Sequence, residues 1–309
     1  MKRYEQNVLF FLIFASLVAI GGNWEFCRHW VDMLLYSPPL YLPPIGNSAM
    51  ADQLCKSHRK VLYGVFSMAH KAETRATLRR QAQCDLNNDV HSTIFIVGKP
   101  KTEQEHEVIA RESQAHGDVF VLTCSENMNE GKSYAYFKEA SQQLPCFDFY
   151  AKVDDDTAFV PNKLSRRLDS IQNNASLYIG RSPVNEDTAL YLYILKTIQF
   201  SFRDMSWLFK FRTYNAGMLY VLNSQAVRQW VALAPTQLYG DEDYRTSYYM
   251  TLIGATVVDL STSFHDYIKY KTSPFKNHWR LGITHDSLAV HQCKSTQDLS
   301  DAFEAVCSA

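Results

Sequence analysis

Hydrophobic and polar positions alternate along the middle of the chain as short apolar runs separated by longer amphipathic stretches. Short apolar runs predict buried strands, and amphipathic stretches of ten or more residues predict helices. The strands predicted up to mid-chain are Val61–Ser67, Ser92–Gly98, Asp118–Thr123 and Phe149–Val153. The helices predicted between them are Glu73–Gln83, Thr102–His116 and Glu130–Gln143. This alternation predicts an α/β fold with a mostly parallel open sheet flanked by helices.

The helix at Thr102 has the clearest start, because Thr102 is a suitable N-cap and Glu105 follows three residues later as a capping box. The second half of the chain is less regular. It predicts helices at Pro161–Ile171, Ser224–Ala234 and Asp241–Ile253, and strands at Ser176–Arg181 and Tyr214–Leu222. The aromatic-rich stretch Thr188–Phe211 fits no single element, and its tyrosines are interpreted as core, with an acceptor groove as the alternative.

The N-terminus predicts a membrane anchor. Lys2 and Arg3 precede an uncharged apolar run that extends from Val8 to Gly22. Basic residues ahead of such a run predict that the N-terminus is cytosolic and the remainder luminal. A cleaved signal peptide is the alternative, since Ala19-Ile20-Gly21 offers a small-x-small site. Both interpretations place the rest of the chain in the secretory pathway.

The chain therefore divides into four predicted parts. We expect a cytosolic tail at 1–7, a transmembrane signal-anchor at 8–24, a stem at 25–60 and a luminal catalytic domain at 61–309. Four prolines between residues 37 and 46 favour an extended spacer in the stem.

Composition excludes several classes of function. A formal net charge of -1 gives no support to a nucleic-acid partner. The seven cysteines form no C-x-x-C pair, which argues against a structural zinc site, and disulfides among them are expected if the domain is luminal. Neither G-x-G-x-x-G nor G-x-x-x-x-G-K-[ST] occurs, so no dinucleotide fold or P-loop is indicated. The sequon Asn174-Ala175-Ser176 fits a secretory protein.

Three consecutive acids, Asp154, Asp155 and Asp156, follow the predicted strand Phe149–Val153. Side chains alternate in an extended chain, so Asp154 and Asp156 should point one way and Asp155 the other. Two carboxylates at one strand end can hold a divalent cation, and oxygen ligands suit magnesium or manganese. A solvated acidic turn is the alternative, but apolar residues flank the acids on both sides. The pattern predicts a metal site at the tip of this strand, where open α/β sheets bind ligands.

Other residues offer related chemistry. In the second acid cluster, Asp241 to Asp243, one carboxylate could act as a general base, although acids are also common at helix N-termini. His291 follows the apolar residues 287–290 and is the candidate to complete the metal site, with His285 as the second choice. Arg75 and Arg79, with Arg80, are candidates for a nucleotide diphosphate, or else form a solvated helix face.

Residues 151–161, AKVDDDTAFVP, resemble the K-x-DDD-x-F-V signature of the β-1,3-galactosyltransferase and β-1,3-N-acetylglucosaminyltransferase family. Further blocks resemble that family in the same order, over roughly residues 61 to 303. They are RATLR at 75–79, IFIVG at 94–98, HGDV at 116–119, Lys132, YNAGMLY at 214–220, EDY at 242–244 and LAVHQCKSTQDLSDAF at 288–303. The order of these blocks is more specific than any one of them.

The resemblance implies a GT-A fold in a type II, single-pass Golgi membrane protein. It also implies inverting transfer of galactose or N-acetylglucosamine from a UDP-sugar, with Mn²⁺ or Mg²⁺, to a glycan on a glycoprotein or glycolipid. Carried onto this chain, Asp154, Asp156 and His291 would bind metal, and Asp243 would be the base. The residues at the donor would be Arg75, Arg79, Asp118, Lys132, Asp154 and Asp155.

The chain departs from the family pattern in places that bear on the sugar transferred. Gln81 and Ala82 replace a Thr-Trp pair, Leu219 replaces a second glycine, and Arg212 replaces a proline. We expect these positions to lie near the donor and acceptor pockets. A secretory carbohydrate-binding protein without turnover is the alternative function, and a metal-dependent phosphohydrolase is a third.

Overall fold

The computed structural model describes residues 47–56, 60–81, 90–127, 129–171, 174–182, 215–235, 242–267 and 282–308. All of these belong to one compact unit, Pro44–Ala309. The predicted tail, anchor and most of the stem lie outside the described residues, as does the aromatic-rich stretch Thr188–Phe211. None of the described helices has the length and apolar character that crossing a bilayer requires.

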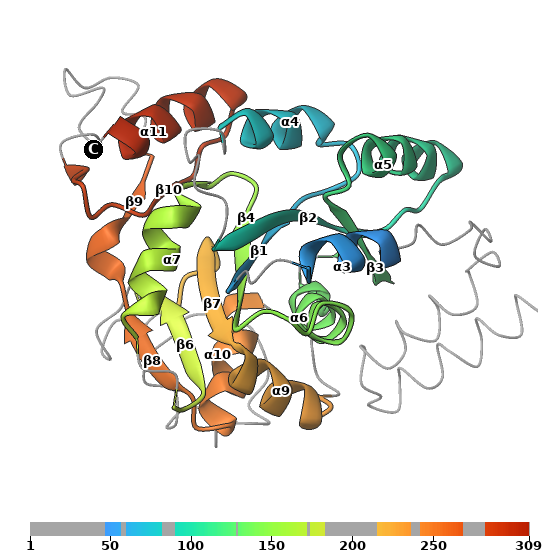
Figure 1. The fold of residues 1–309 in the computed structure, drawn as a ribbon. Coiled ribbons are helices and arrows are strands. Elements are labelled where there is room, and N and C mark those ends of the chain that lie inside the picture. The colour runs from blue at the N-terminus through green and yellow to red at the C-terminus, as the bar shows by residue number, and fades with distance from the viewer. Residues whose placement is uncertain are drawn as a thin grey trace, which may run out of the picture. The chain divides into compact units, whose positions relative to one another are not determined.

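A seven-stranded sheet forms the centre of the unit, in the order β3-β2-β1-β4-β7-β6-β8 (Figure 1). Its strands are β1 Val61–Phe66, β2 His91–Lys99, β3 Val119–Ser125, β4 Phe149–Asp154, β6 Leu177–Gly180, β7 Leu219–Asn223 and β8 Thr256–Asp259. β7 runs antiparallel to both of its neighbours, and every other pairing in this sheet is parallel. The predicted α/β architecture with a mostly parallel sheet is confirmed.

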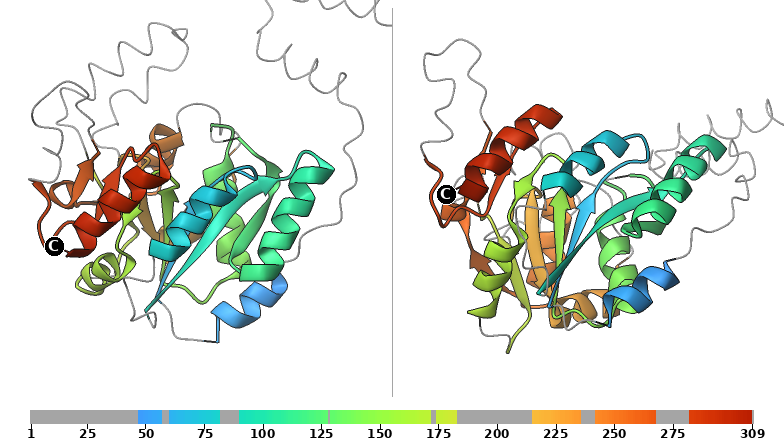
Figure 2. Two further views of the ribbon diagram at one scale, coloured as in Figure 1. Left: turned by 90° about the horizontal axis from the view of Figure 1, so that it is seen from above. Right: turned by 45° about the horizontal axis from the view of Figure 1, so that its top comes forward.

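A second, three-stranded sheet has the order β5-β10-β9. It consists of β5 Ala158–Phe159, β10 Ala289–His291 and β9 Phe264–Asp266. The helices are α3 Ser48–Leu54, α4 Ala72–Gln81, α5 Glu103–His116, α6 Lys132–Gln143, α7 Pro161–Asp169, α9 Ser224–Ala232, α10 Glu242–Leu252 and α11 Thr296–Ser308. The views in Figure 2 show α4, α5 and α11 on the same side of the large sheet.

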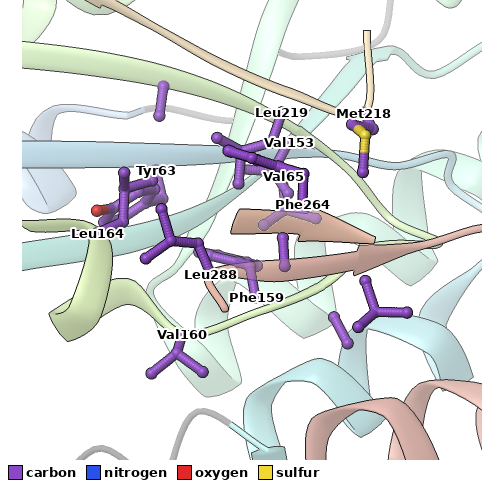
Figure 3. Packing of buried hydrophobic residues seen from close by; sticks show 14 of the residues in the cluster. Tyr63, Val65, Val153, Phe159, Val160, Leu164, Met218, Leu219, Phe264 and Leu288 are labelled. Carbon is purple, nitrogen blue, oxygen red and sulfur yellow. The ribbon is translucent and has the colours of Figure 1, made fainter. Parts of the chain in front are cut away.

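The two faces of the large sheet belong to different parts of the core. Val61, Tyr63 and Val65 of β1 pack with residues of α7, α11 and the small sheet, and Figure 3 shows this cluster between the two sheets. Leu62 and Phe66 face the other way, toward α3, α6, α9 and α10. Because β1 is buried on both faces, its sequence is continuously apolar rather than alternating.

Local signals in the sequence set several element boundaries. Thr102 caps α5 as predicted, because its hydroxyl accepts the N–H of Glu105. The Glu105 carboxylate does not complete the expected box with Thr102, and accepts the N–H of Lys101 instead. α7 begins at Pro161. The missing N–H of proline costs no hydrogen bond at this position, because the first N–H groups of a helix have no intrahelical acceptor.

The folded part of the chain begins before residue 61, the boundary predicted from the sequence. Met50 and Leu54 of α3 are buried against the core cluster that contains α6. A disulfide joins Cys55 to Cys146, in the turn that leads into β4. The last residues assigned to the stem therefore pack as part of the globular unit, and the sequence missed this because α3 is only seven residues long.

The strand order predicts a ligand site at one edge of the sheet. The chain passes from β1 to β2 and β3 on one side of β1, and then returns to place β4 on its other side, so the strand order reverses between β1 and β4. Open α/β sheets bind ligands outside the carboxyl ends of strands at such a switch point. The carboxyl end of β4 is Asp154, the first of the three acids.

Candidate active site

Asp154, Asp156 and His291 converge at this edge, each half-buried. One ligand atom from each lies within 4.8 Å of the other two. His291 Nε2 is 3.3 Å from Asp156 Oδ1 and 3.9 Å from Asp154 Oδ2. β10 brings His291 to the acids because it pairs with β5, which immediately follows the acidic turn. The sequence prediction that these three residues lie together is supported by this geometry.

The charges of this cluster are balanced by neighbouring cations. Burial opposes the charge on His291, but hydrogen bonds with Asp156 and Asp266 raise the pKa of its imidazole to about 9. Burial likewise opposes ionisation of Asp156, but hydrogen bonds from His291 and Lys294 hold the pKa of its carboxyl well below the usual range. Asp156 is therefore held in its ionised form, which is the form of a carboxylate that binds a divalent cation.

Asp155 is not part of the group formed by Asp154, Asp156 and His291, and it lies in the turn after β4 rather than in extended chain. It is buried, and its Oδ1 lies 2.7 Å from Lys71 Nζ, in the segment after β1. Its other oxygen has no hydrogen-bond partner among the described residues. An incompletely paired buried carboxylate oxygen beside a lysine is a candidate acceptor for hydroxyl or N–H groups of a ligand.

Lys152 connects the two acid clusters. Its ammonium group is buried, lies 2.7 Å from Asp154 Oδ1 and 3.3 Å from Glu242 Oε2, and donates to the carbonyl oxygen of Gly217. Glu242 also accepts the hydroxyl of Tyr220. From the sequence, Glu242 was interpreted as an ordinary acid at a helix N-terminus. The bridge through Lys152 was missed, because a lysine two positions before Asp154 gives no signal that it also contacts Glu242.

Asp243, the predicted base, lies at the start of α10 beside Gly217. A methyl group on Gly217 would lie 3.2 Å from Glu242 Oε2, 3.4 Å from Lys152 Nζ and 3.6 Å from Asp243 Cβ. Since Lys152 also contacts Asp154, this close packing brings Asp243 to the same edge as the metal-binding candidates. Asp241, the first acid of the second cluster, lies outside the described residues.

The structure gives no support to the predicted contact of Arg75 with a donor. Arg75 is fully buried, and its Nε and Nη2 atoms lie 2.8 and 2.5 Å from the two oxygens of Glu112. Its remaining N–H groups reach the hydroxyl of Ser67 and the carbonyl oxygens of Met68 and Ala69. Because a guanidinium group has five N–H donors, these bonds use its full capacity. Arg75 holds the segment after β1 in place.

Arg79 and Asp118 likewise form a pair with each other. Arg79 donates to both oxygens of Asp118 at 2.7 Å, and its guanidinium group lies over the ring of Phe95. Asp118 precedes β3, so it lies at the amino edge of the sheet, opposite the acidic turn. The prediction that these two residues contact the donor is therefore not supported, and the pair stabilises the packing of α4.

Lys132 does lie at the edge of the sheet where the parallel strands have their carboxyl ends, but its ammonium group is hydrogen-bonded to other residues of the protein. It donates to the carbonyl oxygen of Ser67 at 2.8 Å and to Glu126 at 2.6 Å. Glu126 follows β3 and also accepts the N–H of Gly98, so the two residues connect the ends of β1, β2 and β3. Lys132 and Glu126 thus order the carboxyl edge of these strands, and Glu126 was missed from the sequence.

Several further expectations can be compared with the structure. His285, the second choice for the metal, is exposed and pairs with Asp286. Gln81 donates to Ser300 of α11, and Leu219 is fully buried in the core, so both of these departures from the family pattern make contacts within the protein. Ala82 and Arg212 lie outside the described residues.

Comparisons with known proteins agree with the geometry. The profile of a family described as Galactosyltransferase matches residues 74–260. A curated relative, beta-1,3-galactosyltransferase pvg3 of Schizosaccharomyces pombe, is 32% identical over 128 residues, which are 40% of this chain and 34% of that protein. Another, named "Probable beta-1,3-galactosyltransferase 13", of Arabidopsis thaliana, is 26% identical over 177 residues, 54% of this chain and 49% of that protein. The chain thus matches half or less of the length of these relatives.

Solved structures with a related arrangement include two glycosyltransferases. The bifunctional glycosyltransferase WbbM is 12% identical, with a TM-score of 0.47 over 80% of this chain and 50% of that one. The galactosyltransferase LgtC, in complex with donor and acceptor sugar analogues, is 10% identical, with a TM-score of 0.43 over 80% of this chain and 95% of that one.

Proposed function

The chain belongs to the galactosyltransferase family, and from that premise we propose that it is a metal-dependent inverting glycosyltransferase of the GT-A type. It would move galactose or N-acetylglucosamine from a UDP-sugar to a hydroxyl of a glycan on a glycoprotein or glycolipid, forming a β-1,3 linkage. The observation that carries the proposal is the convergence of Asp154, Asp156 and His291 at the sheet edge that also holds Asp243. The names of the two curated relatives support the donor class and the linkage.

Asp154, Asp156 and His291 would hold the metal. Two carboxylate oxygens and one imidazole nitrogen suit Mn²⁺ better than Mg²⁺, which prefers oxygen ligands throughout. When bound, the ion would neutralise the charge that develops on the departing UDP. Lys152 orients Asp154 by binding its Oδ1, and this leaves Oδ2 on the side of His291.

Asp243 would take the proton of the acceptor hydroxyl as that oxygen attacks the first carbon of the donor sugar. A single displacement of this kind inverts the anomeric centre and needs no second, nucleophilic carboxylate. Gly217 serves the reaction by leaving room for the two acid clusters to approach one another. Asp155 and Lys71 border the crevice on the β1 side and would contact the donor.

The test of the metal role is activity and binding with Asp156→Ala. The purified chain is assayed with Mn²⁺ and UDP-galactose, UDP-N-acetylglucosamine or UDP-glucose, and UDP release and transfer are both measured. Asp156→Ala should abolish metal-dependent transfer, because it removes one of three ligands. Asp286→Asn is the matched control, since Asp286 is exposed and pairs only with an exposed histidine among the contacts described for it. Equal activity of Asp156→Ala and the wild type would overturn the metal assignment.

The test of the base is Asp243→Asn, which keeps the shape of the side chain. We expect binding of UDP with Mn²⁺ to be retained in calorimetry, and transfer to fall by about 10²- to 10⁴-fold, the usual contribution of a general base. Full transfer by this variant would remove Asp243 from the base role. Binding of UDP by the wild type without turnover of any donor would instead favour a carbohydrate-binding protein, and release of phosphate from UDP would favour a phosphohydrolase.

We further propose that the protein resides in the Golgi membrane as a single-pass type II protein with a luminal catalytic domain. The apolar run near the N-terminus supports an anchor. The disulfide between Cys55 and Cys146 supports a luminal location, because disulfides are rare in the cytosol, and Cys307 is also disulfide-bonded.

A further inference from the structure

A carboxylate lies behind the histidine of the metal-binding cluster. Asp266 ends β9 and His291 ends β10, and the parallel pairing of these strands places the two residues directly side by side. His291 Nδ1 lies 3.6 Å from Asp266 Oδ1, while Nε2 faces Asp156 and Asp154. The two ring nitrogens of His291 thus have different carboxylate neighbours. Nε2 faces the acidic turn, and Nδ1 faces Asp266.

Asp266 is itself held by a cation. Arg181 Nη1 donates to Asp266 Oδ2 at 2.9 Å, which leaves Oδ1 for His291. The backbone of Arg181, which follows β6, is fixed because its carbonyl oxygen accepts the N–H of Ala216 at 2.7 Å. Asp266 is therefore held in one orientation, with Oδ2 toward Arg181 and Oδ1 toward His291.

We propose that Asp266, fixed by Arg181, is a positioning residue that holds His291 in the tautomer and orientation needed to bind the metal. The inference rests on the proposed function of the Asp154–Asp156–His291 site. A neutral imidazole binds a metal through the nitrogen that carries no proton, and a carboxylate behind the other nitrogen keeps the proton there. With the proton on Nδ1 facing Asp266, the lone pair of Nε2 points at the space between Asp154 and Asp156.

This role differs from that of a ligand or a catalytic group. The ring of His291 lies between Asp266 and the two acids, and Asp266 acts on the metal through that ring alone. Removing such a partner typically weakens metal binding by about 10- to 100-fold without removing a ligand. The sequence gives no signal for Asp266, because it becomes a neighbour of His291 only through the register of β9 on β10.

The test is the affinity of the full chain for Mn²⁺ without any donor, measured by calorimetry. Asp266→Leu should bind Mn²⁺ about 10- to 100-fold more weakly than the wild type. Asp266→Asn should lose less, because its amide oxygen can still accept the Nδ1 proton. Arg181→Gln should weaken Mn²⁺ binding less than Asp266→Asn does, and Asp259→Asn should not change Mn²⁺ binding. Asp259 is a matched control, since it ends β8 and its carboxylate caps Ser261 and Ser182.

Thermal midpoints of all variants are measured in parallel, so that loss of affinity is compared only between folded proteins. If Asp266→Leu does not fold, Asp266→Asn provides the test, together with the tautomer of His291 read by ¹⁵N NMR with Mg²⁺. Wild-type affinity in folded Asp266→Leu would overturn this inference and leave the proposed function standing. So would a wild-type His291 that is still protonated on Nε2 when the site is saturated with Mg²⁺. Failure of the wild type to bind Mn²⁺ would overturn both.

Discussion

Two buried lysines near the candidate site, Lys152 and Lys132, each contact a carboxylate. The balance between burial and that contact sets the direction in which the pKa of each lysine shifts. Burial alone would lower the pKa of Lys152, but Asp154 and Glu242 raise it above the ordinary lysine value. For Lys132 the balance is reversed, because burial outweighs the attraction of Glu126 and the pKa is lowered. Lys152 is therefore a permanent positive charge at Asp154, and it fixes which carboxylate oxygen remains on the side of His291.

The first prediction concerns Glu112, which lies between Arg75 and Arg79. Burial opposes its charge, but hydrogen bonds from the two arginines lower its pKa below the ordinary value of 4.5. A lowered folded-state pKa stabilises the protein above the unfolded-state pKa, and that stability is lost as pH falls through the folded-state value. Glu112→Gln should therefore cost about 3 kcal/mol at neutral pH, because it leaves a buried arginine without its counter-charge.

Urea denaturation between pH 7 and pH 3 measures this effect. The free energy of unfolding of Glu112→Gln should depend less on pH below about 4.5 than that of the wild type. Glu107→Gln, an exposed position on the same helix, is the control and should follow the wild-type curve. Parallel pH curves for wild type and Glu112→Gln would contradict the assignment.

Residue types alone could not separate site residues from structural ones. Asp154 and His291 were predictable because each follows an apolar run, and Asp156 because it lies two residues beyond Asp154, where a strand end reaches an edge of the sheet. Arg79 and Asp118 looked like donor contacts from their motifs, yet Asp118 precedes its strand and so belongs to the opposite edge. Whether a residue precedes or follows its strand decides which edge of the sheet it occupies, and the motif alone does not include this information.

At the scale of elements, long periodic segments were predictable and short ones were not. α5 and β1 match their predicted ranges within one residue. β5 has two residues and β9 three, too few for any periodicity, and both form only because β10 pairs between them. The small sheet that carries His291 is thus a product of tertiary contacts, which explains why Asp266 was not found from the sequence.

A prediction at this scale concerns Gly64, in the middle of β1. A methyl group there would lie 2.5 Å from Cζ of Tyr136, whose ring is fully buried and whose hydroxyl donates to Ala151 at 3.0 Å. Gly64→Ala should therefore destabilise the protein by about 1–3 kcal/mol, the usual cost of overpacking a core. Urea denaturation measures the change in unfolding free energy.

A double-variant comparison isolates the cause. In a Tyr136→Leu background the clash partner is absent, so Gly64→Ala should cost less than it does in the wild type. Gly282→Ala is the control, since a methyl group there would make only ordinary contacts, at 3.6 Å from His265. An equal cost of Gly64→Ala in both backgrounds would show that the tyrosine ring is not the obstacle.

At the scale of the whole unit, the candidate site is assembled from distant parts of the chain. The three acids begin with the last residue of β4, Asp154, and continue into the turn after it. The antiparallel neighbour of β4, β7, follows Gly217, which packs against the start of α10. β10 supplies His291 from near the C-terminus. The sheet edge at the amino ends of the parallel strands carries none of these groups, so modifications there should leave the reaction unaffected.

Asn174 tests this division together with the proposed luminal location. It is exposed, belongs to the chain's one N-x-[ST] sequon, and precedes β6, whose amino end lies at the edge opposite Asp154. Expressed with its N-terminal segment in eukaryotic cells, the protein should carry an N-glycan that an endoglycosidase removes, and Asn174→Gln should lack it. Transfer by Asn174→Gln should equal that of the wild type, because a glycan on Asn174 projects from the edge remote from the crevice. An unmodified Asn174 in a membrane-bound, active protein would argue that the domain faces the cytosol, where the sequon is not used.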